Sequence, residues 1–257
     1  MWTLDPQSRV PAWRFEPSPP GVTLAFSTRQ GGVSVGPYRS LNLGRSTHDR
    51  PEAVVENRRL LLTLLGLEPS RLATAGQVHG TTVTHVRDPG LHPDCDALVT
   101  TTPGIALAVT AADCLPILYT APGAVAAAHS GWRGTAAGAP EAVLAAVCAA
   151  AGTGPERVTI HLGPGIRGCC YQVGPEVAKR FPTEAIRHAA ASLHLDLPTA
   201  ARLRLLEAGA SPEAIHDTGA CTACAPQWYF SHRRDRGLTG RHWGLAALRS
   251  PRDASRV

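Results

Sequence analysis

Two histidines and one cysteine have the residue types and sequence contexts of a metal-ligand set. Cys114 stands in "ADC" before a short apolar run, His129 stands in "AAHSGWRG" after another, and His79 stands in "GQVHG". Two imidazoles and one thiolate suit zinc, and three protein ligands leave a fourth coordination position for water or substrate. Long stretches of chain separate the three residues, so only neighbouring strand ends can bring them together. The sequence therefore predicts a zinc site of the catalytic type.

The same residues are compatible with a second chemistry, and also with none. A cysteine beside a histidine can act as a thiolate–imidazolium nucleophile without a metal, with Asp113 or His79 orienting the imidazole of His129. Such a site would hydrolyse or deamidate a substrate through a thioester. A buried thiol and hydrogen-bonded histidines would explain the residues without any function. Stoichiometric bound metal distinguishes the zinc site from the cysteine nucleophile.

Loop arginines form a second candidate group, because guanidinium groups bind phosphate through paired hydrogen bonds. The candidates are Arg29, Arg133, Arg233 and Arg234. Each would otherwise be a solvated surface residue. The glycine-rich stretch 163–168 lacks the lysine of a phosphate loop and the spacing of a dinucleotide fingerprint.

The remaining cysteines have weaker signals. "CTAC", with Cys221 and Cys224, has the spacing of half a zinc knuckle or of a redox pair. A second CxxC is missing from the sequence, although the adjacent thiols Cys169 and Cys170 are candidate partners. Ordinary burial is the favoured interpretation of this group. Cys95 is also expected to pack.

Apolar periodicity and helix signals predict the elements that position these residues. We expect strands at 22–28, 82–86, 97–100, 105–109, 115–119, 124–128, 158–162 and 228–231. We expect helices at 51–65, 140–151, 184–192 and 196–208, with further helices starting at 175 and 211, and Asp49 as the N-cap of the first. Helices that interleave irregularly with clusters of strands favour an α+β fold with mixed sheets over a regular βαβ series.

Composition restricts the functional classes. The net charge of +5 comes from arginine, since Lys179 is the only lysine, and aromatic residues are only 5% of the chain. This balance permits anionic ligands, but the absence of basic tracts interleaved with aromatics argues against nucleic acid. No segment approaches the length of a membrane span, and the first residues lack the pattern of a signal peptide. Seven cysteines do not suggest a secreted disulfide framework, so we expect a cytoplasmic protein with reduced thiols.

Taken together, the motifs resemble a known family. "FSTRQGGVS", "SLNLG", "ENR", "QVHG", "DALVT", "ADCLPIL", "AAHSGWRG", "GPGI" with "YQVG", "CT" and "FSHRRDRGLTGR" occur in the order seen in the YfiH family of laccase-domain, polyphenol-oxidase-like proteins. The resemblance covers about residues 21–248 of what is expected to be a single domain, 1–257.

The resemblance implies a single-domain αββα sandwich of mixed β-sheets flanked by helices, and a zinc site made by His79, Cys114 and His129. It also implies purine nucleoside phosphorolysis, with inosine, guanosine, adenosine or methylthioadenosine and phosphate as substrates, together with adenosine deamination. Other descriptions of the family imply a copper-dependent polyphenol oxidase or an enzyme that edits cell-wall precursors.

Physical chemistry favours zinc over copper. A multicopper oxidase needs several copper centres with many histidine ligands, and this sequence has no His-x-His pair. Phosphorolysis requires an oriented phosphate and a stabilised leaving purine. We expect phosphate and ribose to be held by Arg29, Arg58, Arg133 and Asn42, and Gln77 to contact the substrate or support a metal ligand.

Four functions therefore remain open, with a monomer favoured. The first is a zinc-dependent purine nucleoside phosphorylase with adenosine deaminase side activity. The alternatives are a metal-free cysteine hydrolase acting on peptidoglycan precursors, a copper oxidoreductase of phenols, and a non-catalytic binding protein that retains an old metal site. Metal content and the effect of replacing Cys114 on turnover distinguish them.

Overall fold

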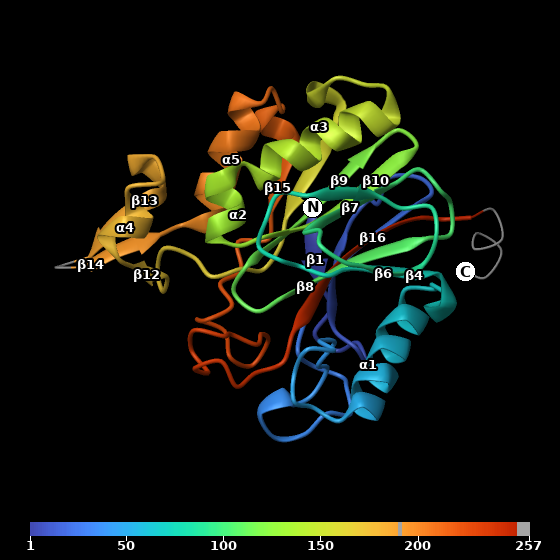
Figure 1. The fold of residues 1–257 in the computed structure, drawn as a ribbon. Helices are drawn as coiled ribbons and strands as arrows, with labels where there is room; N and C mark the ends of the chain where they lie inside the picture. Colours follow the sequence, from blue (N-terminus) through green and yellow to red (C-terminus); the bar gives the residue numbers. More distant parts are fainter. Residues whose placement is uncertain (190–191, 251–257) are drawn as a thin grey trace.

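Two large β-sheets pack face to face between two layers of helices (Figure 1). The computed structural model describes residues 1–189 and 192–250. One sheet has the order β1 (Trp2–Leu4), β2 (Ala12–Phe15), β3 (Val22–Ser27), β16 (His242–Leu248), β8 (Ala106–Ala111), β4 (Leu72–Ala75) and β6 (Gly90–His92). The second has the order β15 (Ile215–Asp217), β11 (Thr159–Leu162), β9 (Leu115–Ala121), β10 (Ala124–Ser130), β7 (Ala97–Thr100) and β5 (Val83–His85). Both sheets contain parallel and antiparallel pairs.

A small third sheet and five α-helices complete the described elements. The third sheet has the order β12 (Gln172–Val173), β14 (Ser192–Leu195) and β13 (Ile186–Ala189). The helices are α1 (Pro51–Leu64), α2 (Trp132–Ala137), α3 (Ala139–Ala151), α4 (Pro175–Ala178) and α5 (Leu197–Glu207). Short 3₁₀ turns cover Gly36–Tyr38, Pro69–Arg71, Pro155–Arg157, Thr183–Ala185 and Pro212–Ala214.

Three apolar cores hold the layers together. Phe26 and Leu107 of the first sheet meet Leu118 of the second in the central core. Outside the first sheet, Leu61 and Leu62 of α1 pack with residues such as Trp243. On the far side, α3 and α5 pack on the second sheet. Each fully buried large apolar side chain contributes about 1.5–3 kcal/mol, so burial on both faces of each sheet is the main stabilising term.

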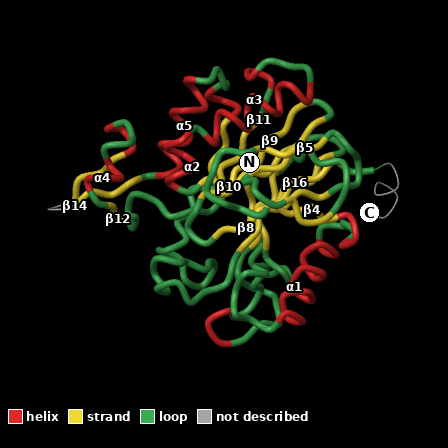
Figure 2. Tube along the Cα trace, in the orientation of Figure 1, coloured by secondary structure: helices red, strands yellow, loops and turns green. Residues whose placement is uncertain are grey.

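This arrangement confirms the predicted αββα sandwich of mixed sheets. Figure 2 shows the strands between α3 and α5 on one side and α1 on the other, with long loops gathered at one end of the sandwich. Among the helices of residues 1–189 and 192–250, none has the length and apolar character needed to cross a bilayer.

The strands at 97–100, 115–119 and 124–128, and the helices at 140–151 and 196–208, are confirmed to within a few residues. The strand predicted at 228–231 is wrong, because this segment is a loop. The helix predicted at 184–192 is also wrong in its described part, which forms a 3₁₀ turn and β13; residues 190–191 lie outside the described residues. There, strand pairing overrides the helix propensity of alanine.

Three smaller predictions also need correction. The helix expected from 175 is the four-residue α4, and the one expected from 211 is a 3₁₀ turn followed by β15. Asp49 does not cap α1, since Arg50 is the N-cap residue and no side chain caps it. Asp49 instead accepts hydrogen bonds from Ser34 and Asn42. The central strand β16 was not predicted at all.

Candidate active site

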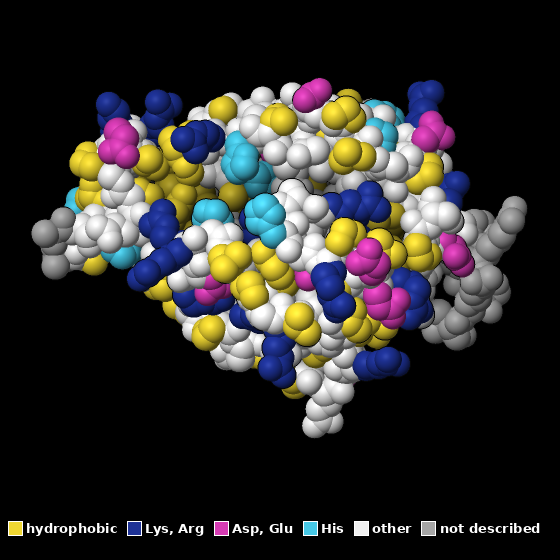
Figure 3. All heavy atoms as spheres, turned by 60° about the horizontal axis from the view of Figure 1, so that its bottom comes forward, with side chains coloured by type: hydrophobic (Ala, Val, Ile, Leu, Met, Phe, Trp, Pro, Cys, Tyr) yellow, Lys and Arg dark blue, Asp and Glu magenta, His cyan; other side chains and the backbone are white. Residues whose placement is uncertain are grey.

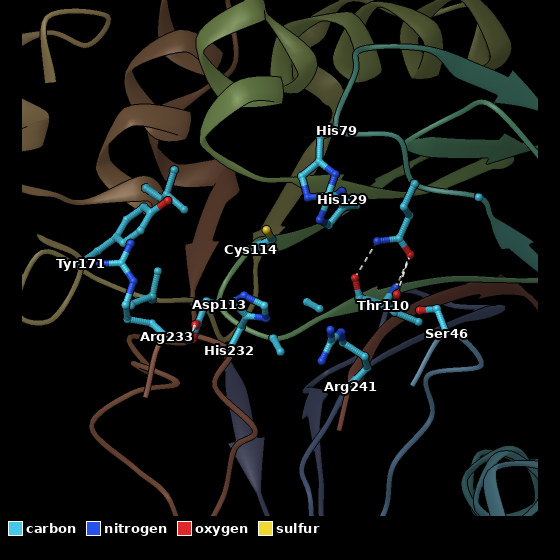
Figure 4. Close-up of a pocket in the computed structure, with 16 residues that line it drawn as sticks. Ser46, His79, Thr110, Asp113, Cys114, His129, Tyr171, His232, Arg233 and Arg241 are labelled. Atoms are coloured by element: carbon cyan, nitrogen blue, oxygen red, sulfur yellow. Dashed lines mark hydrogen bonds between the residues drawn. The ribbon is translucent and has the colours of Figure 1, made fainter. Parts of the chain in front are cut away.

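A cavity of about 350 Å³ opens among the strand ends and loops at one end of the sandwich (Figure 4). Its size lies in the range of small-molecule sites. The residues that line it include all three predicted metal ligands, His79, Cys114 and His129. They also include Gln77, Thr110, Asp113, Tyr171, His232, Arg233 and Arg241. Figure 3 shows histidine side chains grouped near the middle of one face, with arginines around them.

The three predicted ligands meet as a compact cluster, here called the pocket cluster. One donor atom from each of His79, Cys114 and His129 lies within 4.8 Å of the other two. The imidazole rings are 4.9 Å apart and nearly perpendicular. A Cβ atom at Gly131 would lie 3.0 Å from the Cys114 sulfur and 3.3 Å from the His79 ring, so a larger residue there would require these side chains to shift by a few tenths of an ångström.

Strand pairing brings the cluster together. β9 and β10 are antiparallel, and His129 pairs with Pro116 near the end where Cys114 precedes β9. His129 lies within β10, not after it as expected. His79 arrives from the loop between β4 and β5, where its backbone has φ of +63°. The predicted convergence of neighbouring strand ends is therefore correct for Cys114 and His129, and a strained loop supplies the third residue.

Asp96 holds two of the ligands in place. Its carboxylate lies 2.9 Å from His129 Nδ1 and accepts the backbone N–H groups of His79 (2.9 Å) and Gly80 (2.6 Å). With Nδ1–H donating to this carboxylate, Nε2 of His129 is free to bind a metal, which is the usual support of a histidine ligand. The expectation that Asp113 or His79 orients His129 is therefore wrong.

Asp113 instead fixes two loops. Its side chain accepts hydrogen bonds from the Thr222 hydroxyl (2.6 Å) and from the backbone N–H of Arg233 (2.6 Å).

The electrostatics of the pocket cluster favour a thiolate. Burial raises the pKa of Cys114, but His129 and His79 more than offset this and lower it to about 6. Burial lowers the pKa of His129, but Cys114 and Asp96 more than offset this and raise it to about 9. A thiolate is the form of cysteine that binds metal or attacks a substrate.

The three donor atoms suit a metal ion that keeps one coordination position open. The cluster offers two nitrogens and one sulfur, all facing a cavity that can supply a water or substrate atom as the fourth ligand. The buried Asp96–His129 pair gives the support that such ligands normally have.

Gln77, which was expected to contact the substrate or support a metal ligand, lines the cavity and is tied to a strand. Its side-chain amide donates to the Thr110 carbonyl (2.7 Å), while its carbonyl oxygen accepts the Thr110 backbone N–H (2.7 Å) and hydroxyl (2.8 Å). These bonds fix the loop that carries His79.

The other predicted contacts lie outside the residues that line this cavity in the described chain. Asn42 is fully buried, and its side-chain amide oxygen accepts a hydrogen bond from the backbone N–H of Arg241 (2.9 Å). Arg58 is buried over the Trp243 ring and donates to the Leu43 carbonyl. Arg29 donates to the carbonyls of Arg39 and Pro226. Arg133 is exposed beside the Trp132 ring.

Asn42 therefore supports the cavity residue Arg241, and Arg58 supports the protein core. Of the loop arginines, Arg233 lines the cavity, whereas Arg234 donates to the carbonyls of Thr222 and Tyr229.

Sequence reasoning missed four residues at or behind the cavity. Asp96, Tyr171, His232 and Arg241 were not predicted. Asp96 stands in the "DALVT" motif, and Arg241 ends the "LTGR" motif, so both lie in stretches that carry the family resemblance. Their positions in those motifs were the available signal.

Comparisons with known proteins agree with the fold and with the motifs. A purine nucleoside phosphorylase of Deinococcus radiodurans is 42% identical over 233 residues, covering 88% of this chain and 89% of the relative. The purine nucleoside phosphorylase YfiH of Escherichia coli is 40% identical, covering 90% of this chain and 95% of the relative. The crystal structure of YlmD from Geobacillus stearothermophilus superposes with a TM-score of 0.91 at 34% identity, covering 97% of this chain and 100% of that structure.

The family model described as multi-copper polyphenol oxidoreductase laccase matches residues 23–249. The chain therefore belongs to the multi-copper polyphenol oxidoreductase laccase family, whose relatives include the YfiH and YlmD proteins.

Proposed function

We propose that the protein is a zinc-dependent purine nucleoside phosphorylase that converts a purine nucleoside and phosphate to the free base and ribose 1-phosphate. The observation that carries this proposal is the meeting of the pocket cluster with Arg233 and Arg241 in one cavity of about 350 Å³. The substrates we propose are inosine, guanosine, adenosine and methylthioadenosine. The names of the relatives support the same reaction class.

His79, Cys114 and His129 are the residues that would hold the zinc ion. When bound there, zinc supplies a Lewis acid that lowers the pKa of a coordinated water and can polarise a purine atom. Asp96 holds the His129 ring through Nδ1, so that Nε2 is the nitrogen that would bind the metal. The depressed pKa of Cys114 means that the thiolate is available near neutral pH.

Arg233 and Arg241 are the phosphate ligands in this proposal. In Figure 4 they lie on either side of His232, and the Arg233 guanidinium lies against Tyr171 and donates to the Gln172 carbonyl (2.7 Å). The backbone of each is fixed, because Arg233 N–H donates to Asp113 (2.6 Å) and Arg241 N–H donates to Asn42 (2.9 Å). A fixed pair of guanidinium groups can orient one phosphate oxygen toward the anomeric carbon and offset the charge of the dianion.

The reaction then balances as a substitution at the anomeric carbon. A phosphate oxygen forms a bond to C1′ of the ribose as the C1′–N9 bond breaks, and the departing purine takes up a proton. Tyr171 lies across the cavity with Arg233 over its ring (4.9 Å). Burial raises the pKa of Tyr171 to about 12, so its hydroxyl stays protonated and can donate a hydrogen bond to the base.

The proposal includes adenosine deamination as a side activity, in which water adds at C6 of the purine and ammonia leaves; a metal held by His79, Cys114 and His129 would supply the Lewis acid for this reaction. Copper oxidase chemistry is less favoured, because the sequence has no His-x-His pair and the cluster offers only two imidazoles. A cytoplasmic, monomeric single-domain enzyme that acts on small molecules and not on nucleic acid is part of this proposal.

The direct test is incubation of the protein with inosine in phosphate buffer and in phosphate-free buffer, with zinc measured on the same sample. We expect hypoxanthine and ribose 1-phosphate to appear together, and only with phosphate. Hypoxanthine formed without phosphate would indicate a hydrolase, and no turnover with full zinc would contradict the proposed reaction.

Arg241→Gln tests the phosphate site. Removal of a charged hydrogen-bond donor costs about 1.5–3 kcal/mol, so the KM for phosphate should rise about 10- to 150-fold while zinc content stays unchanged. Arg87→Gln, at an exposed position outside the cavity lining, is the matched control and should leave the KM for phosphate unchanged. An equal KM for phosphate in both variants would remove Arg241 from the phosphate site.

A further inference from the structure

A second group of metal-binding side chains lies outside the pocket, and we call it the four-thiol cluster. It consists of Cys169, Cys170, Cys221 and Cys224. All four are free thiols, and every sulfur lies within 4.8 Å of the other three. The Cys224 sulfur is 3.4 Å from that of Cys169 and 3.3 Å from that of Cys170.

These spacings match one central ion. A regular tetrahedron with Zn–S bonds of about 2.3 Å places its sulfur atoms about 3.8 Å apart. An iron–sulfur cluster needs wider spacing, because several iron atoms and inorganic sulfides lie between the thiolates. Four sulfur ligands without an open position are the pattern of structural zinc sites.

All four cysteines also lie in or beside tight backbone turns, which can bring several thiols to one metal ion. Cys221 and Cys224 flank a two-residue turn, and Cys169 and Cys170 form a second turn before β12. The two turns are joined by the bridge between Gly165 and Cys221.

The four thiols lack a balancing charge of their own. The nearby guanidinium of Arg167 is already paired with the Asp217 carboxylate, at 2.9 and 2.6 Å. A divalent cation would displace the four thiol protons and leave a net charge of −2 on the site.

We propose that the four-thiol cluster binds one zinc ion in a closed, tetrahedral structural site. The ion joins the loop between β11 and β12 to the loop between β15 and β16, two segments far apart in the chain. This site is separate from the pocket cluster and does not depend on the proposed reaction.

The two loops that carry the four thiols form one wall of the cavity. Tyr171 follows Cys170 and lines the cavity, and Thr222 follows Cys221 and donates to Asp113, the residue before Cys114. Ile166, in the first loop, donates its backbone N–H to the Asp113 carbonyl (2.8 Å). The structural zinc therefore holds the segments that position Tyr171 and Asp113.

The test is a metal count on matched variants, purified under reducing conditions from zinc-supplemented cells. We expect about two zinc ions per chain in the unaltered protein and about one in Cys114→Ala. Cys224→Ser should also keep about one, and the double variant should keep none. Cys148→Ser, which alters a partly buried cysteine of α3, is the matched control and should keep both.

X-ray absorption on zinc-loaded Cys114→Ala gives an independent readout that does not require a cluster variant to fold. We expect about four sulfur neighbours at about 2.3 Å and no nitrogen shell. Three results would overturn the proposal: no zinc in Cys114→Ala, zinc bound through nitrogen or oxygen, or bound iron. A mass deficit that shows disulfides among the four cysteines in the reduced preparation would also overturn it.

Discussion

The pocket cluster and the four-thiol cluster each bring potential metal-ligand atoms within 4.8 Å of one another, yet they differ in donor type and number. His79, Cys114 and His129 offer two nitrogens and one sulfur and face a cavity, whereas the second group offers four sulfurs. Three ligands leave a position for a substrate or water, and four close the coordination sphere. Proximity of ligand atoms makes both clusters candidate metal sites, while the number of ligands and the adjacent cavity indicate different roles for them.

The two clusters also differ in what supports them. A buried carboxylate, Asp96, anchors His129 and the loop of His79. The backbone bridge to Gly165 and the turn at 222–224 hold Cys221. A carboxylate that fixes a histidine tautomer tunes the ligand for chemistry, whereas a turn places a thiolate without restricting a ring. Substitutions in the two clusters should therefore affect different properties.

The largest effect is expected for Cys114→Ala. Loss of a metal that supplies several kcal/mol of transition-state stabilisation should lower kcat/KM for inosine phosphorolysis by about 10³-fold or more. Cys148→Ala is the matched control and should retain activity. Phosphorolysis that survives in a Cys114 variant without metal in the pocket would place the chemistry elsewhere.

Asp96→Asn should have the next largest effect. The substitution removes the anionic acceptor of His129, and loss of such a partner costs about 10- to 100-fold in metal affinity or activity. Zinc competition with a chelator and kcat/KM measure the two quantities. Asp94→Asn changes an exposed residue two positions away and should leave both unchanged. Equal zinc affinity and activity in the two variants would show that Asp96 does not tune the site.

Cys224→Ser should lower the free energy of unfolding while retaining most of the catalytic activity. Loss of a structural metal is among the mechanisms that destabilise a protein most, so the free energy of unfolding should fall by about 2 kcal/mol or more. Because the pocket ligands remain, kcat/KM at a temperature well below Tm should fall less than tenfold. Denaturant unfolding and kinetics on the same preparation measure both. A loss of activity as large as that of Cys114→Ala, with unchanged stability, would reverse the roles of the two clusters.

The smallest effect concerns the pH dependence of thiol reactivity in metal-free protein. The pKa of Cys114 is lowered to about 6, whereas the pKa values of Cys169, Cys170 and Cys224 are raised to about 11. The thiolate forms as pH rises through the pKa, so alkylation of Cys114 should level off above about pH 7. Alkylation of the other three should still rise at pH 9. Peptide mass spectrometry over a pH series checks this, and parallel profiles would contradict the electrostatic difference.

Much of the fold follows from local sequence patterns. The apolar runs at 97–100, 115–119 and 124–128 are strands because apolar residues fill both faces of a sheet that is buried on both sides. β16 escaped prediction because glycine and alanine in "HWGLAAL" weaken the strand signal, although pairing with β3 and β8 fixes it at the centre of its sheet. The single-domain organisation over 1–257 stays a prediction.

The candidate site was predictable in its ligands and less so in its surroundings. His79, Cys114 and His129 could be selected because their side chains have metal-binding chemistry and stand beside strands. The cavity contacts could not, since the local pattern of a loop arginine does not show whether its side chain lines the cavity, as that of Arg233 does, or lies outside the cavity lining, as that of Arg234 does. Roles for Arg29, Arg58, Arg133 and Asn42 in substrate binding stay predictions.

Residue types and short spacings in the sequence were enough to predict core strands such as β9 and β10, to select His79, Cys114 and His129 as candidate ligands, and to recognise the family resemblance. The sequence did not predict that Asp96 anchors His129, that Arg241 reaches the cavity, or that "CC" and "CTAC" form one four-thiol cluster, all of which are seen only in the tertiary structure. Each of those contacts joins segments far apart in the chain. Their formation depends on sheet pairing and packing across the whole sandwich, which no local pattern encodes.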